Sequence, residues 1–102
     1  QLHADQIGEH LLAGMKDMMK RHEIIGDVRG SGLFLGVELV KSRETLEPAT
    51  TEADEVINLM RSQNILLGTD GPFHNVLKIR PPMPFNAQDA DRLLTALDGI
   101  LR

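Results

Sequence analysis

The stretch EIIGDVRGSGLFLGVELV, residues 23–40, constrains the fold of this chain more than any other feature. It is rich in Ile, Val, Leu and Phe, and Gly30-Ser31-Gly32 interrupts it in the middle. Glycine adopts the positive φ angles that tight hairpin turns require. The stretch therefore predicts two neighbouring strands that are joined by a short glycine turn.

Three segments show the spacing of amphipathic helices. The first lies between Leu2 and His22, the second begins after Thr50 or Thr51, and the third follows Asn86. Thr50, Thr51 and Asn86 are suitable N-caps, because their side-chain oxygens can accept hydrogen bonds from free backbone N–H groups. The apolar stripes expected to face the core are Ile7, Leu11, Met15 and Met18; Ala53, Val56, Ile57 and Met60; and Ala90, Leu93, Leu94, Leu97, Ile100 and Leu101.

A second pair of strands is expected between the last two helices. The segments ILLG (65–68) and VLKI (76–79) have strand-like composition, and the glycine-rich loop GTDGPFHN connects them. Pro81 and Pro82 should end the second strand, because proline has no N–H for the ladder. The predicted order α-β-β-α-β-β-α indicates an α+β fold, a two-layer sandwich in which helices cover one face of a mainly antiparallel four-stranded sheet. The other face must meet water or a second domain.

Composition excludes several classes of protein. The chain has 102 residues, enough for one small domain, and only 3% of them are aromatic, so Leu, Ile, Val and Met must fill the core. A net charge of −4, with acids and bases mixed along the chain, argues against nucleic-acid binding. The absence of cysteine excludes a disulfide framework, and no apolar run is long enough to cross a membrane. A cytoplasmic location is the default expectation, and the start on Gln1 suggests a piece of a longer protein.

Lys78 and Arg80 are the residues of greatest functional interest. Side chains alternate along a strand, so these two cations share one face while Leu77 and Ile79 share the other. Their Cα atoms should lie roughly 7 Å apart. Such a pair can bind a carboxylate or a phosphate at the mouth of a site. From the residues alone, a solvated outer face is the simpler interpretation.

No other polar residues form a complete catalytic or metal-binding set. Arg29 could point toward a site or pair with Asp27 or Glu38, and pairing is the simpler interpretation. His3 and His10 lie about two helical turns apart, too far for one metal ion. The residues of the glycine-rich loop whose roles the sequence leaves open are Thr69, Asp70 and His74.

Several segments together carry a family resemblance. IGDVRGSGLFLGVELV, then TTEAD, then NILLGTDGPFHNVLKIRPPMPF and an amphipathic last helix resemble the C-terminal small domain of class III aminotransferases, fold-type I enzymes that use pyridoxal phosphate. The likeness spans nearly all of residues 1–102, so the whole chain is expected to be that domain, without the large cofactor-binding domain. The stretch TDGPFHNVLKIRPP is most similar to the phospho-lyase branch, whose members act on ethanolamine phosphate or phosphorylated hydroxylysine.

The resemblance implies a division of labour between two domains. The large domain supplies the Schiff-base lysine, the carboxylate that faces the pyridine nitrogen and most of the phosphate cup. The lysines of this chain do not stand in that setting; they are Lys16, Lys20, Lys41 and Lys78. The resemblance thus implies no catalytic, cofactor-binding or metal-binding residue here, and an isolated chain that is inactive.

The resemblance also implies that the small domain forms a wall of the substrate site. Many family members place a carboxylate-binding arginine three residues before the first proline, where this chain has Lys78, and Arg80 directly precedes the prolines. A compact lysine charge in place of the planar arginine fork suits a substrate recognised by its phosphate. Lys78 and Arg80 are therefore the expected substrate-binding residues for a small anionic amine, in an intact protein that is a homodimer.

Two interpretations of function remain open at this point. The chain is either part of a transaminase or phospho-lyase, or a free-standing α+β module that docks on a partner protein through its uncovered sheet face. The length of the natural gene product would distinguish these interpretations.

Overall fold

The fold is an α+β sandwich with the predicted order of elements. The computed structural model describes residues 4–31, 34–80 and 86–101. Its elements are α1 (Ala4–Met18), β1 (Ile25–Ser31), β2 (Phe34–Leu39), α2 (Thr50–Ser62), β3 (Gly68–Asp70), β4 (Val76–Ile79) and α3 (Ala87–Ile100). None of the helices in these ranges is long and apolar enough to cross a membrane.

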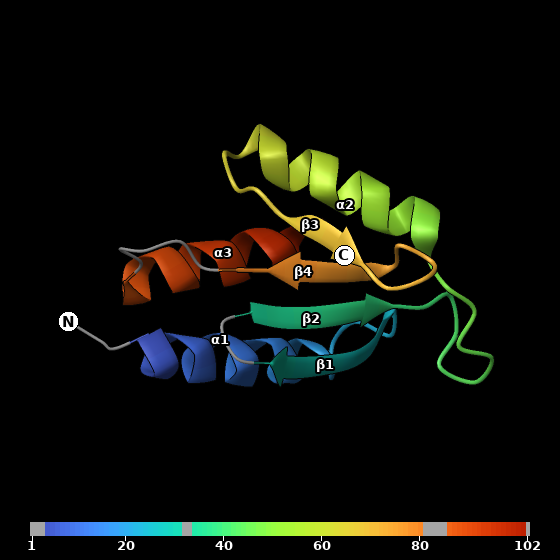
Figure 1. Cartoon of the computed structure of the whole chain (residues 1–102), viewed down its shortest axis with the longest axis horizontal. Coiled ribbons are helices and arrows are strands. Elements are labelled where there is room, and N and C mark those ends of the chain that lie inside the picture. The colour runs from blue at the N-terminus through green and yellow to red at the C-terminus, as the bar shows by residue number, and fades with distance from the viewer. Residues whose placement is uncertain (1–3, 32–33, 81–85, 102) are drawn as a thin grey trace.

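The four strands form one antiparallel sheet in the order β1-β2-β4-β3. The two predicted strand pairs therefore meet through β2 and β4, which are distant in sequence. Figure 1 looks onto the sheet, with α1 and α3 lying behind it. The helices contact each other, α1 also contacts β1 and β2, and α2 contacts β2 and β4; no other described element covers the opposite face of the sheet. The predicted two-layer arrangement is confirmed.

Leu, Ile, Val and Met fill the core between the two layers, as the composition predicts. Strand side chains of the helix-facing side are buried, and the apolar stripes of all three helices pack onto them. The fully buried side chains include Ile7, Leu11, Met15, Met18, Met60, Leu77, Ile79 and Leu97. Removing such surface from water contributes about 25 cal/mol per Å², so this layer is the main source of stability.

The N-cap prediction for the second helix was wrong, whereas that for the third is confirmed. α2 begins at Thr50 with Ala49 as the N-cap and without a side-chain capping bond, because the Thr50 hydroxyl donates instead to the Phe73 carbonyl at 2.6 Å. At α3, Asn86 accepts a hydrogen bond from the backbone N–H of Asp89 at 2.8 Å, and the Asp89 carboxylate accepts from the Asn86 N–H. This is a complete capping box.

The third strand lies later in the sequence than predicted. The segment 65–67 is not part of the sheet, and β3 covers Gly68 to Asp70, which the sequence had placed mainly in a loop. Ile65 is buried while Leu66 is 79% exposed, so the apolar run serves as a connection after α2 rather than as a strand. Gly30 and Ser31 belong to β1, and the rest of the predicted glycine turn and both prolines lie outside the described residues.

Candidate functional site

Strand register arranges the uncovered face of the sheet into rows of unlike charge. Residues that pair directly across strands share a face and lie side by side. One row joins Asp27, Glu38, Val76 and Asp70, and the next joins Arg29, Gly36, Lys78 and Gly68. Two residues along a strand separate these rows, or roughly 7 Å. The uncovered face therefore has an acidic row beside a basic row.

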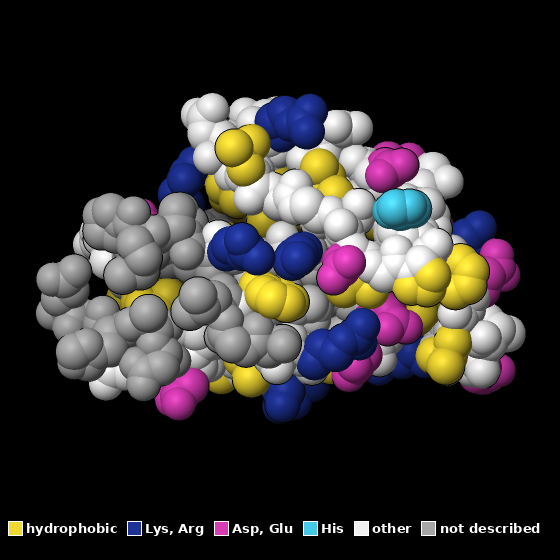
Figure 2. All heavy atoms as spheres, in the orientation of Figure 1, with side chains coloured by type: hydrophobic (Ala, Val, Ile, Leu, Met, Phe, Trp, Pro, Cys, Tyr) yellow, Lys and Arg dark blue, Asp and Glu magenta, His cyan; other side chains and the backbone are white. Residues whose placement is uncertain are grey.

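Lys78 and Arg80 gather on this uncovered face around one aromatic ring. The Lys78 ammonium lies 4.6 Å from the centroid of the Phe34 ring, and the guanidinium carbon of Arg80 lies 5.8 Å from it. Both distances are within the range of a cation–π interaction. Figure 2 shows the same face, where Lys and Arg side chains gather beside a hydrophobic side chain over the sheet. The predicted shared face of Lys78 and Arg80 is what the structure shows.

Neither of these cations is neutralised within the described part of the chain. The ion pairs there involve other residues, and none includes Lys78 or Arg80. Lys78 is half-buried and Arg80 is exposed. Two like charges held near one ring, without a carboxylate between them, are available to bind an anion.

Arg29 differs from these two cations because it is already paired. Its Nη1 donates to Asp27 Oδ2 at 2.8 Å and to Glu38 Oε1 at 3.1 Å. These hydrogen bonds, that to Asp27 first, raise the pKa of Arg29 above its ordinary value. The predicted pairing is confirmed with both carboxylates. Since its charge is already compensated, Arg29 adds less to anion binding than Lys78 does.

A hollow of about 290 Å³ opens on this face of the sheet. Gly36 forms part of its floor, next to Lys78, because a residue without a side chain leaves space above the strand. The residues that line the hollow are Arg29, Gly30, Phe34, Gly36, Asp70, Gly71, Val76 and Lys78. Asp70 stands toward the acidic end and Phe34 toward the basic end. An anion would therefore be held near Lys78 and Phe34.

The loop between β3 and β4 borders the hollow. Gly71 has φ of 87° and His74 has φ of 52°, so the chain turns sharply at both residues. Thr50 anchors the loop through its hydrogen bond to the Phe73 carbonyl. His74 is exposed and Thr69 lies on the helix-facing side opposite Leu77, so of the three residues left open only Asp70 lines the hollow.

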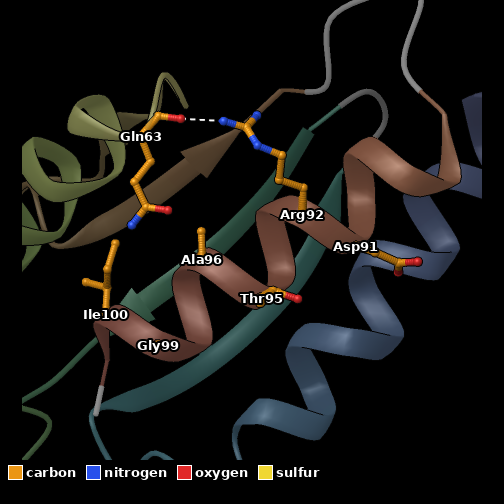
Figure 3. A pocket seen from close by; sticks show the side chains of 7 residues that line it. All are labelled: Gln63, Asp91, Arg92, Thr95, Ala96, Gly99 and Ile100. Atoms are coloured by element: carbon orange, nitrogen blue, oxygen red, sulfur yellow. Dashed lines mark hydrogen bonds between the residues drawn. The ribbon is translucent and has the colours of Figure 1, made fainter.

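A second hollow of about 570 Å³ lies on the outer surface of α3, toward the end of α2 (Figure 3). Arg92 donates to the backbone carbonyl of Gln63 across it. The other side chains around it, among them Thr95, Ala96 and Ile100, are uncharged except for Asp91. It brings together no set of groups suited to acid–base or anion chemistry.

An ionic cluster joins α3 to α1 and to the turn that follows α1, and it involves groups that the sequence did not link. His22 Nε2 lies 2.6 Å from Asp98 Oδ1, and Arg21 Nη2 donates to the same oxygen at 3.0 Å. The hydrogen bond from His22, followed by that from Arg21, holds the pKa of Asp98 below its ordinary value of 3.8. His10 pairs with Asp91. Within the described residues no cluster could hold a metal ion.

The sequence analysis missed Phe34 and Gly36, which line the hollow, and Gly68, which pairs with Lys78 beside it. The sequence reveals strands, but not which strand pairs with which at what register. The pairing of β2 and β3 with β4 places one glycine on each side of Lys78, Gly36 on β2 and Gly68 on β3. The signal that could have found them is a glycine inside a strand, which often marks a close approach by another group.

The chain belongs to the class III aminotransferase family. The family matches residues 1–101, which is nearly the full length, and the α+β fold with an uncovered, charged sheet face is consistent with one domain of such an enzyme.

Two curated relatives and two solved structures illustrate the similarity. The chain is 47% identical over 100 residues to "Ethanolamine-phosphate phospho-lyase homolog 1" of Caenorhabditis elegans, covering 97% of this chain and 21% of the relative. It is 44% identical over 98 residues to "Alanine--glyoxylate aminotransferase 2 homolog 2, mitochondrial" of Arabidopsis thaliana, covering 96% and 20%. The chain thus spans about a fifth of the length of these curated relatives.

Among solved structures, a phospholyase from Arthrobacter in complex with phosphoethanolamine matches with a TM-score of 0.89 at 37% identity, over 96% of this chain and 23% of that chain. An amine transaminase from an uncultivated Pseudomonas species, in its PLP-bound form, matches with a TM-score of 0.81 at 25% identity, over 96% and 22%. The family is therefore one of enzymes, and its chemistry implies pyridoxal phosphate.

The described residues do not by themselves fit pyridoxal phosphate. Lys20 and Lys41 are exposed and paired with carboxylates, and Lys16 is exposed on α1. In the hollow, Arg29 is committed to two carboxylates, and Asp70 would repel the cofactor phosphate. Such a cofactor needs a lysine amine and a partner for its pyridine nitrogen. The hollow has one lysine, Lys78, and one carboxylate, Asp70, but its lining residues offer no further uncommitted cation for the cofactor phosphate.

Proposed function

We propose that this chain is the C-terminal small domain of a longer pyridoxal-phosphate enzyme and forms one wall of its substrate site. In this proposal Lys78 and Arg80 bind the anionic end of a small amine. The observation that carries it is the pair of cations around Phe34, which have no carboxylate partner among the described residues, on a sheet face that none of the described helices covers. Family membership supports an enzyme over an independent interaction module.

The charge pattern favours a compact anion at one end of the face. Asp70, the carboxylate of the acidic row that Arg29 does not pair, repels an anion, while Lys78, roughly 7 Å further along the strand, and Arg80 beyond it attract it. Charge-assisted hydrogen bonds to such a group contribute about 1.5–3 kcal/mol each. A lysine ammonium is a point charge that tolerates several approach directions, which suits a tetrahedral phosphate.

A phospho-lyase that acts on an amino phosphate ester is the function we favour. The similarity to a phospho-lyase homologue at 47% identity and to a phospholyase bound to phosphoethanolamine supports this choice. Amino-group transfer is the second candidate, because a relative named as an alanine–glyoxylate aminotransferase is 44% identical. Both reactions leave Lys78 the same task, which is to hold the anionic end of the substrate.

The rest of the longer polypeptide would hold the cofactor. When bound, pyridoxal phosphate supplies an electron sink for the carbon that carries the amine. Lys78 and Arg80 would bind and orient the far end of the substrate, and Phe34 would hold both side chains in place by contact with its ring. We therefore expect the 102-residue chain to be inactive by itself and the intact enzyme to be a homodimer.

The two reactions differ in what they release. Elimination from phosphoethanolamine consumes one water and yields acetaldehyde, ammonia and inorganic phosphate. Amino-group transfer releases no phosphate and requires an oxo acid as the acceptor. The experiment is to incubate the complete protein with phosphoethanolamine, without any oxo acid, and to assay inorganic phosphate.

Phosphate release by the complete protein, and none by the isolated chain, is the expected result. Alanine with glyoxylate is the matched assay for transfer. Turnover of alanine without any phosphate release from phosphoethanolamine would refute the lyase assignment and support the transferase. Phosphate release by the isolated chain would refute the division of labour between domains.

A further inference from the structure

We infer that Gly68 is a specificity-determining residue, because its missing side chain lets the anionic group of the substrate approach the backbone of β3 opposite Lys78. This inference rests on the proposed function and extends it to a residue that no charge or motif singles out. The ligand class is a small amine that carries a phosphate, which is bulkier than a carboxylate.

Gly68 lies directly beside Lys78 on the uncovered face. The two residues are partners in the antiparallel ladder of β3 and β4. Directly opposed Cα atoms in such a ladder lie about 4.5–5.5 Å apart, and their side-chain directions point to the same face. A side chain at residue 68 would therefore occupy space next to the stem of Lys78.

The fold of this chain does not require glycine at that position. A Cβ placed on Gly68 meets no other atom within 4 Å, and its φ lies outside the left-handed region that favours glycine. Gly68 is the first residue of β3. Glycine in the middle of a strand costs roughly 0.5–1 kcal/mol relative to alanine. A glycine in a strand often marks a bulge, a bend or a place where a ligand or another backbone comes close.

The other glycines at this face have reasons within the fold. A Cβ on Gly36 would lie 3.2 Å from Val76 Cγ1, so a side chain there crowds the neighbouring strand. Gly71 has φ of 87°, a conformation that L-residues rarely adopt. Gly68 has neither constraint, and it stands directly opposite Lys78 on β3, as Gly36 does on β2.

Charge indicates that the group above Gly68 is an anion. Lys78 is adjacent and carries no carboxylate partner within the described residues. Asp70, two residues further along the same strand, repels an anion from the other end. An anionic group held by Lys78 is therefore displaced toward Gly68 and Arg80, where a side chain at residue 68 would obstruct it.

The test introduces that obstacle in the complete protein through Gly68→Ala and Gly68→Val. We expect KM for phosphoethanolamine to rise about ten-fold in the valine variant and less in the alanine variant. This estimate follows from the cost of extra carbon atoms in a substrate pocket. The thermal midpoint should not fall, because the new atoms meet open space in this chain. Absorbance of the bound cofactor should be unchanged.

Gly8→Val is the matched control, since a Cβ at Gly8 also meets nothing within 4 Å but lies on α1. It should leave KM unchanged. Equal KM values for the wild type and both Gly68 variants would overturn the inference. A second result would also overturn it: a lower thermal midpoint and loss of the cofactor, with KM unchanged. That result would mean that Gly68 packs against another domain.

The inference and the proposed function can fail separately. If the wild type releases no phosphate, the lyase assignment fails, and the Gly68 variants are then measured on the anionic amine that the wild type does turn over. A KM effect there supports Gly68 as a specificity-determining residue in a transferase, and its absence overturns the inference.

Discussion

Replacing Lys78 by alanine tests the role of the positive charge on the uncovered face. The variant removes a half-buried ammonium that lies 4.6 Å from the Phe34 ring centroid and has no carboxylate partner among the described residues. Arg80 remains near the same ring, so the face keeps one of the two cations that have no carboxylate partner among the described residues. The change should weaken binding of the anionic end of the substrate without affecting the cofactor.

The magnitude follows from the environment of the ammonium. Two unit charges 4 Å apart interact by about 4 kcal/mol at the effective dielectric constant of a protein surface, which is an upper limit. A hydrogen bond to a charged group contributes about 1.5–3 kcal/mol net. Since about 1.4 kcal/mol corresponds to a ten-fold change in affinity, we expect KM to rise about ten- to hundred-fold. The lost cation–π contact costs only about 0.5–1 kcal/mol, so the fold should persist.

The assay is steady-state phosphate release by the complete protein, with KM, kcat and cofactor absorbance measured for each variant. Lys78→Arg keeps the charge and should recover most of the affinity. Lys16→Ala is the matched control, because it removes the same charge from an exposed position on α1. Added salt should raise KM of the wild type more than that of Lys78→Ala, since screening acts on an attraction that the variant lacks.

A KM for Lys78→Ala within two-fold of the wild type, with normal cofactor absorbance, would refute the assignment of Lys78 to substrate binding. An equal rise in KM for Lys16→Ala would refute it as well, because net charge and not position would then explain the effect.

Three further predictions concern the scaffold and are measured by urea unfolding of the chain. Leu77→Ala empties a fully buried position and should cost about 2–5 kcal/mol, whereas Leu66→Ala, at a side chain that is 79% exposed, should have little effect; equal losses would contradict the helix-facing assignment of Leu77. Asn86→Ala removes the capping box of α3 and should cost about 1 kcal/mol, and an unchanged midpoint would show that the cap is not used. The pKa of Asp98 is lowered in the folded chain by His22, so its ionised form stabilises the fold above the ordinary pKa of 3.8, and this stability is lost as pH falls through the lower, folded pKa. Between about pH 5 and about pH 3 the wild type should therefore lose more stability than Asp98→Asn, and parallel losses would contradict the linkage.

Periodicity and glycine chemistry made most of the fold predictable from sequence. The apolar stripes of the helices and the alternation of Lys78 with Leu77 and Ile79 assign faces without any knowledge of tertiary structure. The errors occurred where tertiary contacts override local preference. Thr50 donates to a loop carbonyl instead of capping its helix, and 65–67 connects elements although its composition is strand-like.

The candidate site was predictable only in part, because it depends on strand order. Alternation placed Lys78 and Arg80 on one face, but the sequence contains no local signal that β4 pairs with β2 on one side and β3 on the other. That pairing brings Phe34 to the two cations and Gly68 to Lys78. Cross-strand neighbours come from distant parts of the chain, so their adjacency is a property of the assembled sheet.

The core determines where the functional charges point. A slip of one residue in β4 would turn Leu77 and Ile79 to the uncovered face and Lys78 toward the helices, because side chains alternate with period two. Exposing two fully buried aliphatic side chains costs about 1.5–3 kcal/mol each, and burying an unpaired ammonium costs several kcal/mol more. The observed register is therefore favoured well beyond thermal energy. Since Leu77 and Ile79 belong to the core and face the helices, we expect them to affect binding only by holding Lys78 outward, and apolar exchanges there that keep the register should leave KM unchanged.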